Sequence, residues 1–244
     1  MDSFTKKWNK YLTEQTNKEM YVFDFDDTIT DNSKLDFESF KAACSKFNIK
    51  NPLSFKKLVY FRKKSYTAKD ILKFIKISSD KTFSAKNFLE FRNNFLSNDV
   101  SNHHLKLKAD TRLILETLKK NKIPTILCTV RKDKQLVINF LKMNHIKNYF
   151  TNILCSSDLT VKIDNTISDN RILIKSSLLK KITKKYRFNS DHMLYIGNSF
   201  EDRTASLSHK ITFLKFNNDY LPDEIHDDLY STNTMKNLNK IIKK

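Results

Sequence analysis

Two carboxylates at the end of a short apolar segment near the N-terminus have the spacing that phosphate chemistry needs. Asp24 and Asp26 end the segment Tyr21–Asp26, and Thr28 follows. If the segment is a regular strand, the two carboxylates share one face. Crowded like charges call for a cation, and Mg²⁺ commonly takes one or two carboxylates together with water and phosphate oxygens. One carboxylate could then act as a nucleophile and the other as an acid and base.

A second polar group follows the apolar segment Met193–Ile196. It contains Gly197, Asn198 and Asp202. Asn198 and Asp202 are four residues apart, so a helix that begins near Ser199 would place them on one side. An amide or carboxylate oxygen there could contribute to the same metal site.

Two further side chains could hold phosphate oxygens. Thr129 follows the apolar segment Pro124–Cys128 and offers a hydroxyl, and Lys175 stands near the start of a predicted helix and offers a positive charge. We count four polar groups: the Asp24–Thr28 segment, Thr129, Lys175 and the Gly197–Asp202 segment. Together they supply a nucleophile, an acid and base, metal ligands and a phosphate clamp.

These residues need a sheet to bring them together, and the chain predicts one. The predicted strands are Tyr21–Asp26, Pro124–Cys128, Asn152–Cys155, Met193–Ile196 and Ile211–Phe216. The predicted helices between and after them are Thr111–Lys120, Lys132–Met143, Ile172–Tyr186, one from Ser199 and one from Met235 to the end. This alternation predicts an α/β fold with a mostly parallel sheet covered by helices on both faces. Ligands of such sheets lie outside the carboxyl ends of the strands, where all four groups fall.

The segment from about 32 to 108 has no strand signal and instead shows helical stripes of apolar residues. These include Phe37, Phe40 and Ala43–Cys44, then Ile71–Leu72 and Phe74–Ile75, then Phe88, Phe91 and Phe95. Spacings of three and four residues predict helices that pack on one another. We therefore expect a core domain from 1–33 and 109–244, with a helical domain inserted at 34–108.

The four polar groups resemble the motifs of the haloacid dehalogenase-like (HAD) hydrolase superfamily. Val22–Thr28 resembles its first motif, in which DxDxT follows hydrophobic residues, and Ile126–Thr129 resembles the second. Lys175–Leu178 is similar to the third, and Leu194–Asp202 resembles the fourth. The resemblance covers about 20–30 and 110–216, which implies a Rossmann-like core with an inserted α-helical cap.

The resemblance implies a role for each matching residue. Asp24 would attack phosphorus and form an aspartyl-phosphate, Asp26 would serve as acid and base, and Thr129 and Lys175 would hold the phosphate. The implied Mg²⁺ ligands are Asp24, the Asp26 backbone carbonyl and Asn198, with Asp202 in support. Asp26 also argues against dehalogenase chemistry, because dehalogenases of the superfamily lack this second carboxylate.

Two positions depart from the family pattern. Asn198 stands where the family usually has Asp, so one negative charge is missing and we expect weaker Mg²⁺ binding. Asp27 stands where Gly is frequent. About 45 residues separate Thr129 from Lys175, too few for the other cap position of the superfamily. We therefore expect an Mg²⁺-dependent phosphomonoesterase whose cap closes over a small phosphorylated metabolite.

Other functions remain open at this stage. The net charge of +18 suggests a phosphatase acting on nucleic-acid ends, although A/T-rich codon usage also explains a lysine-rich chain. A sugar phosphomutase would use the same aspartate chemistry. Asn198 also raises the alternative of a non-catalytic binding protein on a degraded HAD core.

Composition excludes several classes of protein. The single glycine, Gly197, cannot build the glycine-rich loops of P-loop NTPases, Rossmann dinucleotide binders or protein kinases. We expect Gly197 to allow close backbone approach and an unusual φ/ψ. Three cysteines without ligand spacing and the lack of a long apolar segment predict a cytoplasmic protein without a membrane partner. The oligomeric state stays open.

Two small clusters are interpreted as structural. His103–His104 has no partners at metal-ligand spacing, so a solvated or helix-capping pair is favoured. Arg62–Lys64 is favoured as a solvated helix end over a contact with a distal anion of the substrate.

Overall fold

A computed structural model describes residues 18–50, 53–63, 66–75, 83–97, 104–109, 111–160, 168–216, 225–226 and 229–232. The chain divides into two compact units. We call them the core unit, Met1–Thr30 with Leu107–Lys244, and the helical unit, Asp31–Lys106.

The core unit contains a seven-stranded sheet of order β5-β4-β1-β6-β7-β9-β8. Its strands are β1 (Met20–Phe23), β4 (Thr125–Thr129), β5 (Asn152–Cys155), β6 (Met193–Gly197), β7 (Thr212–Phe216), β8 (Ile225–His226) and β9 (Leu229–Thr232). All neighbours run parallel except the antiparallel pair β8–β9. The five predicted strands are confirmed. The prediction missed β8 and β9, which are short and lack a continuous apolar run.

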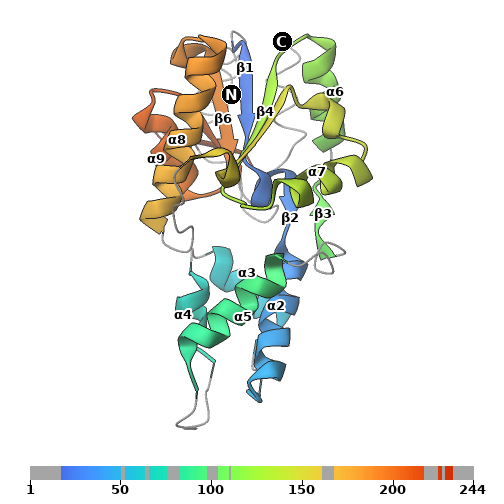
Figure 1. The fold of residues 1–244 in the computed structure, drawn as a ribbon, viewed down its shortest axis with the longest axis vertical. Helices are drawn as coiled ribbons and strands as arrows, with labels where there is room; N and C mark the ends of the chain where they lie inside the picture. The colour runs from blue at the N-terminus through green and yellow to red at the C-terminus, as the bar shows by residue number, and fades with distance from the viewer. Residues whose placement is uncertain are drawn as a thin grey trace, which may run out of the picture. The chain divides into compact units, whose positions relative to one another are not determined.

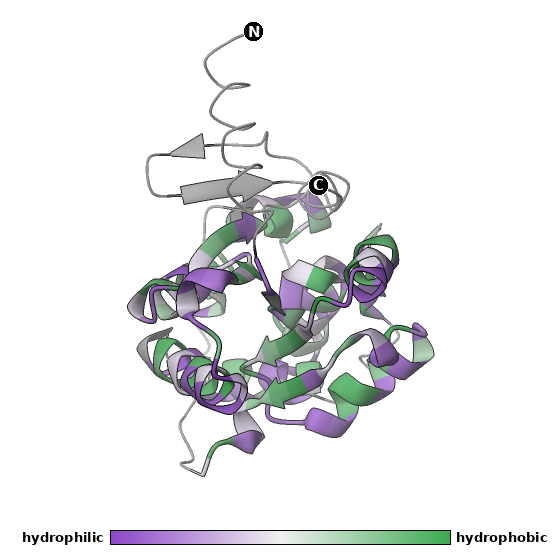
Figure 2. Ribbon diagram, turned by 90° about the horizontal axis from the view of Figure 1, so that it is seen from above, coloured by the Kyte–Doolittle hydropathy of each residue, from purple (hydrophilic) through white to green (hydrophobic). Residues whose placement is uncertain are grey.

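Helices cover both faces of this sheet, as the alternating pattern predicts. Helices α6 (Thr111–Lys120) and α7 (Lys134–Met143) lie on one side, and α8 (Ser168–Tyr186) and α9 (Phe200–Ser208) lie on the other (Figure 1). The strands are strongly apolar, while the helices alternate between polar and apolar residues (Figure 2). The predicted helix from Met235 onward lies outside the described residues.

The layer between the sheet and α8 is a close-packed apolar core. It combines strand residues such as Val22, Ile126 and Tyr195 with Leu178 and Ile182 of α8, all fully buried. Strands buried on both faces explain why their sequences are apolar runs rather than alternating patterns. This packing fixes the strand ends that carry the polar groups.

The first strand is shorter than predicted. It ends at Phe23, and Phe25–Ile29 instead form an irregular turn, η2, in which Asp26 has an extended backbone. Asp27 there has a φ of 55°, a left-handed conformation that Asp tolerates better than most residues and Gly best. The prediction of a regular strand through Asp26 is therefore wrong, and the family's preference for Gly at this position has a conformational reason.

Two short strands connect the units in sequence. β2 (Thr30–Asp31) and β3 (Lys106–Leu107) form a separate two-stranded sheet. β3 falls in the segment where no strand was predicted, because two residues carry no detectable alternation.

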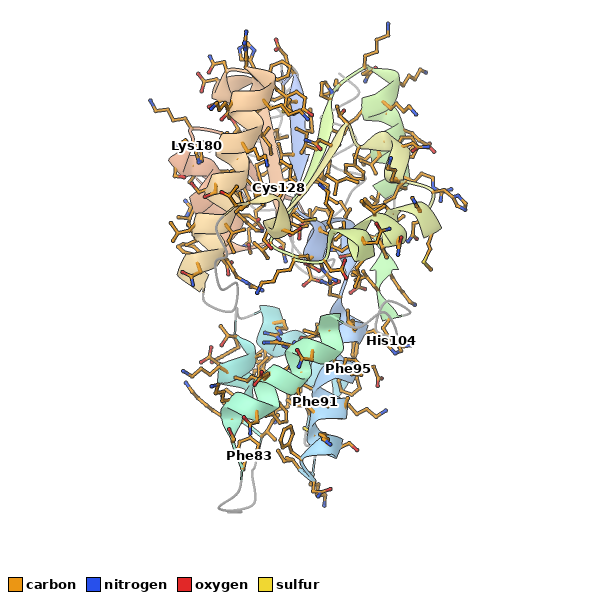
Figure 3. All side chains as sticks on the ribbon, in the orientation of Figure 1. Phe83, Phe91, Phe95, His104, Cys128 and Lys180 are labelled. Atoms are coloured by element: carbon orange, nitrogen blue, oxygen red, sulfur yellow. The ribbon has the colours of Figure 1, made fainter. Side chains whose placement is uncertain are left out.

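The helical unit is built from α2 (Ser33–Lys46), α3 (Phe55–Lys63), α4 (Ala68–Leu72) and α5 (Ala85–Ser97). This confirms the helical insertion. Its core includes the buried rings of Phe40, Phe61 and Phe88. Phe91 and Phe95 lie on α5 and Phe83 just before it (Figure 3), so the predicted aromatic stripes are packing residues.

One buried ion cluster joins three of these helices. Asp36 on α2 accepts hydrogen bonds from Arg62 Nε at 2.7 Å and Arg62 Nη2 at 2.9 Å, and it also accepts from Arg92 Nη2 of α5. Both guanidinium groups lie over the Phe40 ring. Arg62 is therefore not a solvated helix end but a packing residue. The rest of its basic cluster, the Lys63 side chain and Lys64, lies outside the described residues.

Among the described residues, no helix is long and apolar enough to cross a membrane.

Candidate active site

A buried lysine joins two carboxylates at the carboxyl ends of β1 and β6. Lys175 Nζ donates to Asp24 Oδ1 at 2.9 Å and also to Asp202 Oδ1. The three side chains are at most 5% exposed. Asp24 directly follows β1, and its N–H donates to Ile196 O at 2.9 Å, which ties it to the neighbouring strand. The sheet thus brings together residues 178 positions apart.

Asp202 is held by four further hydrogen bonds. Its Oδ1 accepts from the Tyr195 hydroxyl at 2.9 Å, and its Oδ2 accepts from Ser199 N at 3.1 Å and Ser199 Oγ at 2.7 Å. Ser199 is the N-cap of α9, and its Oγ accepts from Asp202 N at 3.1 Å. This reciprocal capping box fixes the Asp202 carboxylate, which in turn orients Lys175.

Burial and the charges of this cluster shift the pKa values of Asp24 and Lys175. Burial raises the pKa of Asp24 to about 8, with Asp202 adding to the rise and Lys175 opposing it. Burial disfavours the charged form of Lys175, but the two carboxylates outweigh it and raise its pKa. The cluster therefore keeps Lys175 protonated and leaves Asp24 short of positive charge.

The single glycine of the chain borders this cluster. A Cβ built on Gly197 would lie 2.6 Å from both Cγ and Oδ2 of Asp202, closer than such atoms approach in proteins. The φ of Gly197 is not positive. Close approach was predicted correctly, whereas the unusual φ/ψ was not: glycine is required here for space.

A second carboxylate–cation pair lies beside the first, and its cation was missed in the sequence. Arg131 donates from Nη2 to Asp26 Oδ1 at 2.7 Å and from Nε to both carboxylate oxygens at 3.0 Å. Its guanidinium lies 5.2 Å from the centre of the Phe25 ring. Burial opposes the charge of Arg131, but Asp26 outweighs burial and raises its pKa. The signal that could have found it is a basic residue two positions after the β4 threonine.

Thr129 and Asn198 lie at the ends of β4 and β6, as predicted, but Asn198 precedes the N-cap of α9 instead of sharing the helix with Asp202. Lys175 lies in the middle of α8 and not near its start. Thr129 ends β4, is fully buried, and its Oγ1 accepts from Arg131 N at 3.2 Å, which leaves its own hydrogen free to donate. Thr28 Oγ1 lies 3.5 Å from Asp24 Oδ2. Asn198 is half-buried in the turn between β6 and α9, and its side chain makes no hydrogen bond within the described part of the chain.

His104 and the cysteines do not join this site. His104 belongs to the helical unit and, among the residues that the structure describes, no cluster of three His, Cys, Asp or Glu side chains could hold a metal ion. Cys44, Cys128 and Cys155 are free and buried, and burial raises the pKa of each thiol. Cys128 lies in the sheet, whereas Lys180 is exposed on α8 (Figure 3).

Solved structures share this fold. A protein assigned as a phosphatase from Clostridium difficile superimposes with a TM-score of 0.63 at 22% identity, over 82% of this chain and 85% of the other. A subfamily IA HAD-superfamily hydrolase from Geobacter sulfurreducens gives 0.62 at 14% identity, over 93% and 97%. A predicted phosphoglycolate phosphatase from Haemophilus somnus gives 0.59 at 15% identity, over 90% and 89%.

Sequence comparison gives the family directly. No curated protein matches the chain. The family model described as haloacid dehalogenase-like hydrolase matches residues 21–216, which include all four motifs and the helical unit. The chain therefore belongs to the haloacid dehalogenase-like hydrolases.

Proposed function

We propose that the protein is an Mg²⁺-dependent phosphomonoester hydrolase that acts on a small phosphorylated metabolite. The observation that carries this proposal is Lys175, buried between Asp24 and Asp202 at the strand ends. A lysine fixed by one carboxylate and paired with a second is suited to hold a phosphate against the second. The phosphatase-like fold of the solved relatives supports the same reaction class.

The reaction divides into two displacements. A carboxylate oxygen of Asp24 attacks phosphorus, the bond from phosphorus to the leaving oxygen breaks, and Asp26 gives that oxygen a proton. Water then attacks the aspartyl-phosphate, Asp26 takes its proton, and the bond to Asp24 breaks. Thr129 and Lys175 hold the phosphate oxygens through both steps.

Arg131 sets the position of Asp26 in this scheme. Its guanidinium lies against the Phe25 ring, and its backbone is held because the Arg131 carbonyl accepts from Ser156 N at 3.1 Å and Ser156 Oγ at 3.2 Å. A two-pronged hydrogen-bonded pair fixes a carboxylate more tightly than a single contact does. When Asp26 carries the proton for the leaving oxygen, its other carboxyl oxygen can still accept from Arg131, so the pair holds Asp26 in place through this step.

The residues present fit a magnesium ion. The Asp24 carboxylate, the Asp26 carbonyl and the Asn198 amide oxygen are hard oxygen donors of the kind that Mg²⁺ prefers, and the Asn198 side chain makes no hydrogen bond within the described part of the chain. When bound, the ion would supply charge stabilisation for the transferring phosphoryl group. Asp202 has both oxygens engaged by Lys175, Tyr195 and Ser199, so we assign it the supporting role.

The test is hydrolysis of p-nitrophenyl phosphate, of a panel of metabolite phosphates and of 3′- and 5′-phosphorylated oligonucleotides, with Mg²⁺ and with chelator. We expect Mg²⁺-dependent turnover of small phosphates that Asp24→Asn lowers by about four orders of magnitude or more. Asp191→Asn, an exposed aspartate of the core unit, is the matched control and should retain activity.

Other outcomes select the alternatives. Full activity in Asp24→Asn would show that the assigned nucleophile is wrong. Turnover confined to oligonucleotides, with a steep salt dependence, would favour a phosphatase of nucleic-acid ends. The net charge of +18 motivates this alternative. Conversion of a sugar phosphate to its isomer without phosphate release would show a mutase. No turnover and no aspartyl-phosphate mimic with beryllium fluoride would leave a binding protein.

A further inference from the structure

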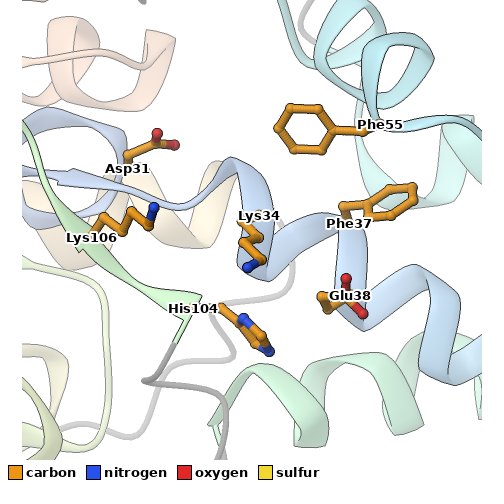
Figure 4. Close-up of a pocket in the computed structure, with 7 residues that line it drawn as sticks. All are labelled: Asp31, Lys34, Phe37, Glu38, Phe55, His104 and Lys106. Carbon is orange, nitrogen blue, oxygen red and sulfur yellow. The ribbon is translucent and has the colours of Figure 1, made fainter.

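The helical unit contains a pocket that the proposed reaction does not use. Its volume is about 390 Å³, within the range of small-ligand sites. The side chains that line it all belong to this unit and are Asp31, Lys34, Phe37, Glu38, Phe55, His104 and Lys106 (Figure 4). They come from the start of α2, the first residue of α3, and the segment around β3. Three segments far apart in sequence therefore build one concave site.

The negative groups of this pocket are already engaged. Asp31 Oδ1 accepts a hydrogen bond from Ser33 N at 2.9 Å, and Glu38 Oε2 lies 3.6 Å from Lys41 Nζ. Within the described part of the chain, the side chains of Lys34, His104 and Lys106 make no hydrogen bond or ion pair. The unmatched groups of the pocket are thus two lysine ammonium groups and one imidazole.

The opposite wall is aromatic. Phe37 and Phe55 meet edge to face, with ring centres 5.7 Å apart and planes at 90°. Phe55 is 43% exposed although it is a large apolar ring. In Figure 4 the two rings lie together on one side of the pocket, and Lys34, His104 and Lys106 lie on the other. An exposed ring edge beside unmatched cations favours a ligand that is apolar at one end and anionic at the other.

We propose that this pocket binds a small organic anion that carries a planar ring, the class to which nucleoside monophosphates belong. The ring packs against Phe37 and Phe55, and the anionic group accepts hydrogen bonds from Lys34 and Lys106. Both connecting strands contribute lining residues, Asp31 from β2 and Lys106 from β3, so the ligand contacts the two places where the chain passes between the units. None of the lining residues belongs to the core unit, which holds all the proposed catalytic residues.

The test uses fluorescence of anilinonaphthalene sulfonate, a planar aromatic anion, with the full chain carrying Asp24→Asn to prevent turnover. We expect saturable binding that Lys34→Gln or Phe55→Ser weakens by about tenfold, the size of one lost charge-assisted contact. Lys46→Gln, at the exposed end of α2, and Tyr60→Ser, 57% exposed on α3, are matched controls and should change binding less than about twofold. All four altered residues are partly or largely exposed, and circular dichroism checks that each variant folds.

Competition identifies the ligand class. We expect AMP to displace the dye at a concentration about tenfold lower than inorganic phosphate or adenosine. Equal weakening by the control variants, or unchanged binding in Lys34→Gln and Phe55→Ser, would overturn the site. Displacement by phosphate as effective as by AMP would overturn the role of the ring. Since fluorescence does not depend on catalysis, these results stand whether or not the proposed hydrolysis is found.

Discussion

The two units each bury a cluster of three charged side chains, and the clusters have opposite composition. In the core unit one cation, Lys175, lies between two carboxylates, Asp24 and Asp202. In the helical unit one carboxylate, Asp36, lies between two cations, Arg62 and Arg92. The first cluster has one negative charge in excess and the second has one positive charge in excess.

The pKa of Asp36 and the pKa of Asp24 are shifted in opposite directions. Burial would raise the pKa of Asp36, but Arg92 and Arg62 lower it to about 2, so this carboxylate is ionised and satisfied. Burial and Asp202 raise the pKa of Asp24 to about 8, so this carboxylate lacks positive charge. A cluster that ties three helices together contributes to stability. A cluster that keeps an unsatisfied carboxylate is suited to receive a further cation and a substrate.

The largest expected effect is a loss of stability when the carboxylate of the helical cluster is removed, with no such loss in the core cluster. Asp36→Ala leaves two largely buried guanidinium groups without their shared carboxylate, and we expect a loss of roughly 3–5 kcal/mol of unfolding free energy. Asp24→Asn removes one of two repelling carboxylates, so without Mg²⁺ it should not lower stability. Denaturant unfolding followed by circular dichroism measures both. Glu38→Gln, whose ion pair with Lys41 is 3.6 Å long and partly exposed, is the control and should change little.

If Asp24→Asn destabilised the metal-free protein as strongly as Asp36→Ala, both clusters would be structural, and the core cluster would not hold an unsatisfied carboxylate.

The Asp26–Arg131 pair has one charge of each sign, so its charges balance, unlike those of the two clusters. Arg131→Ala should lower kcat by roughly 10²–10³-fold for alkyl phosphates, whose leaving oxygen needs the proton from Asp26. The loss should be much smaller for p-nitrophenyl phosphate, whose leaving group needs little protonation. Steady-state kinetics with both substrates measure the difference, and Arg131→Lys should restore part of the alkyl phosphate activity.

An equal loss with both substrates, or a change in KM alone, would show that Arg131 binds substrate rather than positioning Asp26.

A smaller effect should follow from filling the space at Gly197. In Gly197→Ala the added Cβ lies 2.6 Å from Asp202 Cγ, so Asp202 has to move and Lys175 moves with it. We expect a cost of roughly 1–3 kcal/mol in stability and a fall in kcat. Gly197→Val should be worse on both counts. A fully active Gly197→Ala protein would show that the Asp202–Lys175 contact is not needed for activity.

The smallest expected effect is a pH dependence confined to the helical cluster. The folded pKa of Asp36 is about 2, below its ordinary value of 3.8, so its ionised form stabilises the fold fully above about pH 4. This contribution, at most about 2 kcal/mol, is lost as pH falls from 4 through 2. The difference in unfolding free energy between the wild type and Asp36→Asn should therefore shrink over that range. A difference that stays constant would show that Asp36 is not the titrating group.

Much of the fold was predictable because burial leaves a direct pattern in the sequence. The five central strands are apolar runs, since a parallel sheet is covered on both faces, and the helices repeat apolar residues at three and four positions. The last two strands of the sheet, β9 and β8, and the connecting strands β2 and β3 were missed because segments this short carry no such pattern. The end of β1 was misplaced because the chain leaves the sheet after Phe23 while Asp24 and Asp26 keep an extended backbone, and apolar and polar residues alone do not mark where strand pairing stops.

The amino-acid sequence by itself determined the types of chemistry available: carboxylates at two strand ends, a lysine, a threonine and one retained glycine in motif spacing. It could not determine which charges meet, because the partners lie far apart along the chain. Only the tertiary structure paired Arg131 with Asp26 across 105 positions and Arg62 with Asp36 across 26. It also showed that Gly197 gives room to a carboxylate, because parallel strands bring distant residues to one edge of the sheet, where space and charge are decided by neighbours.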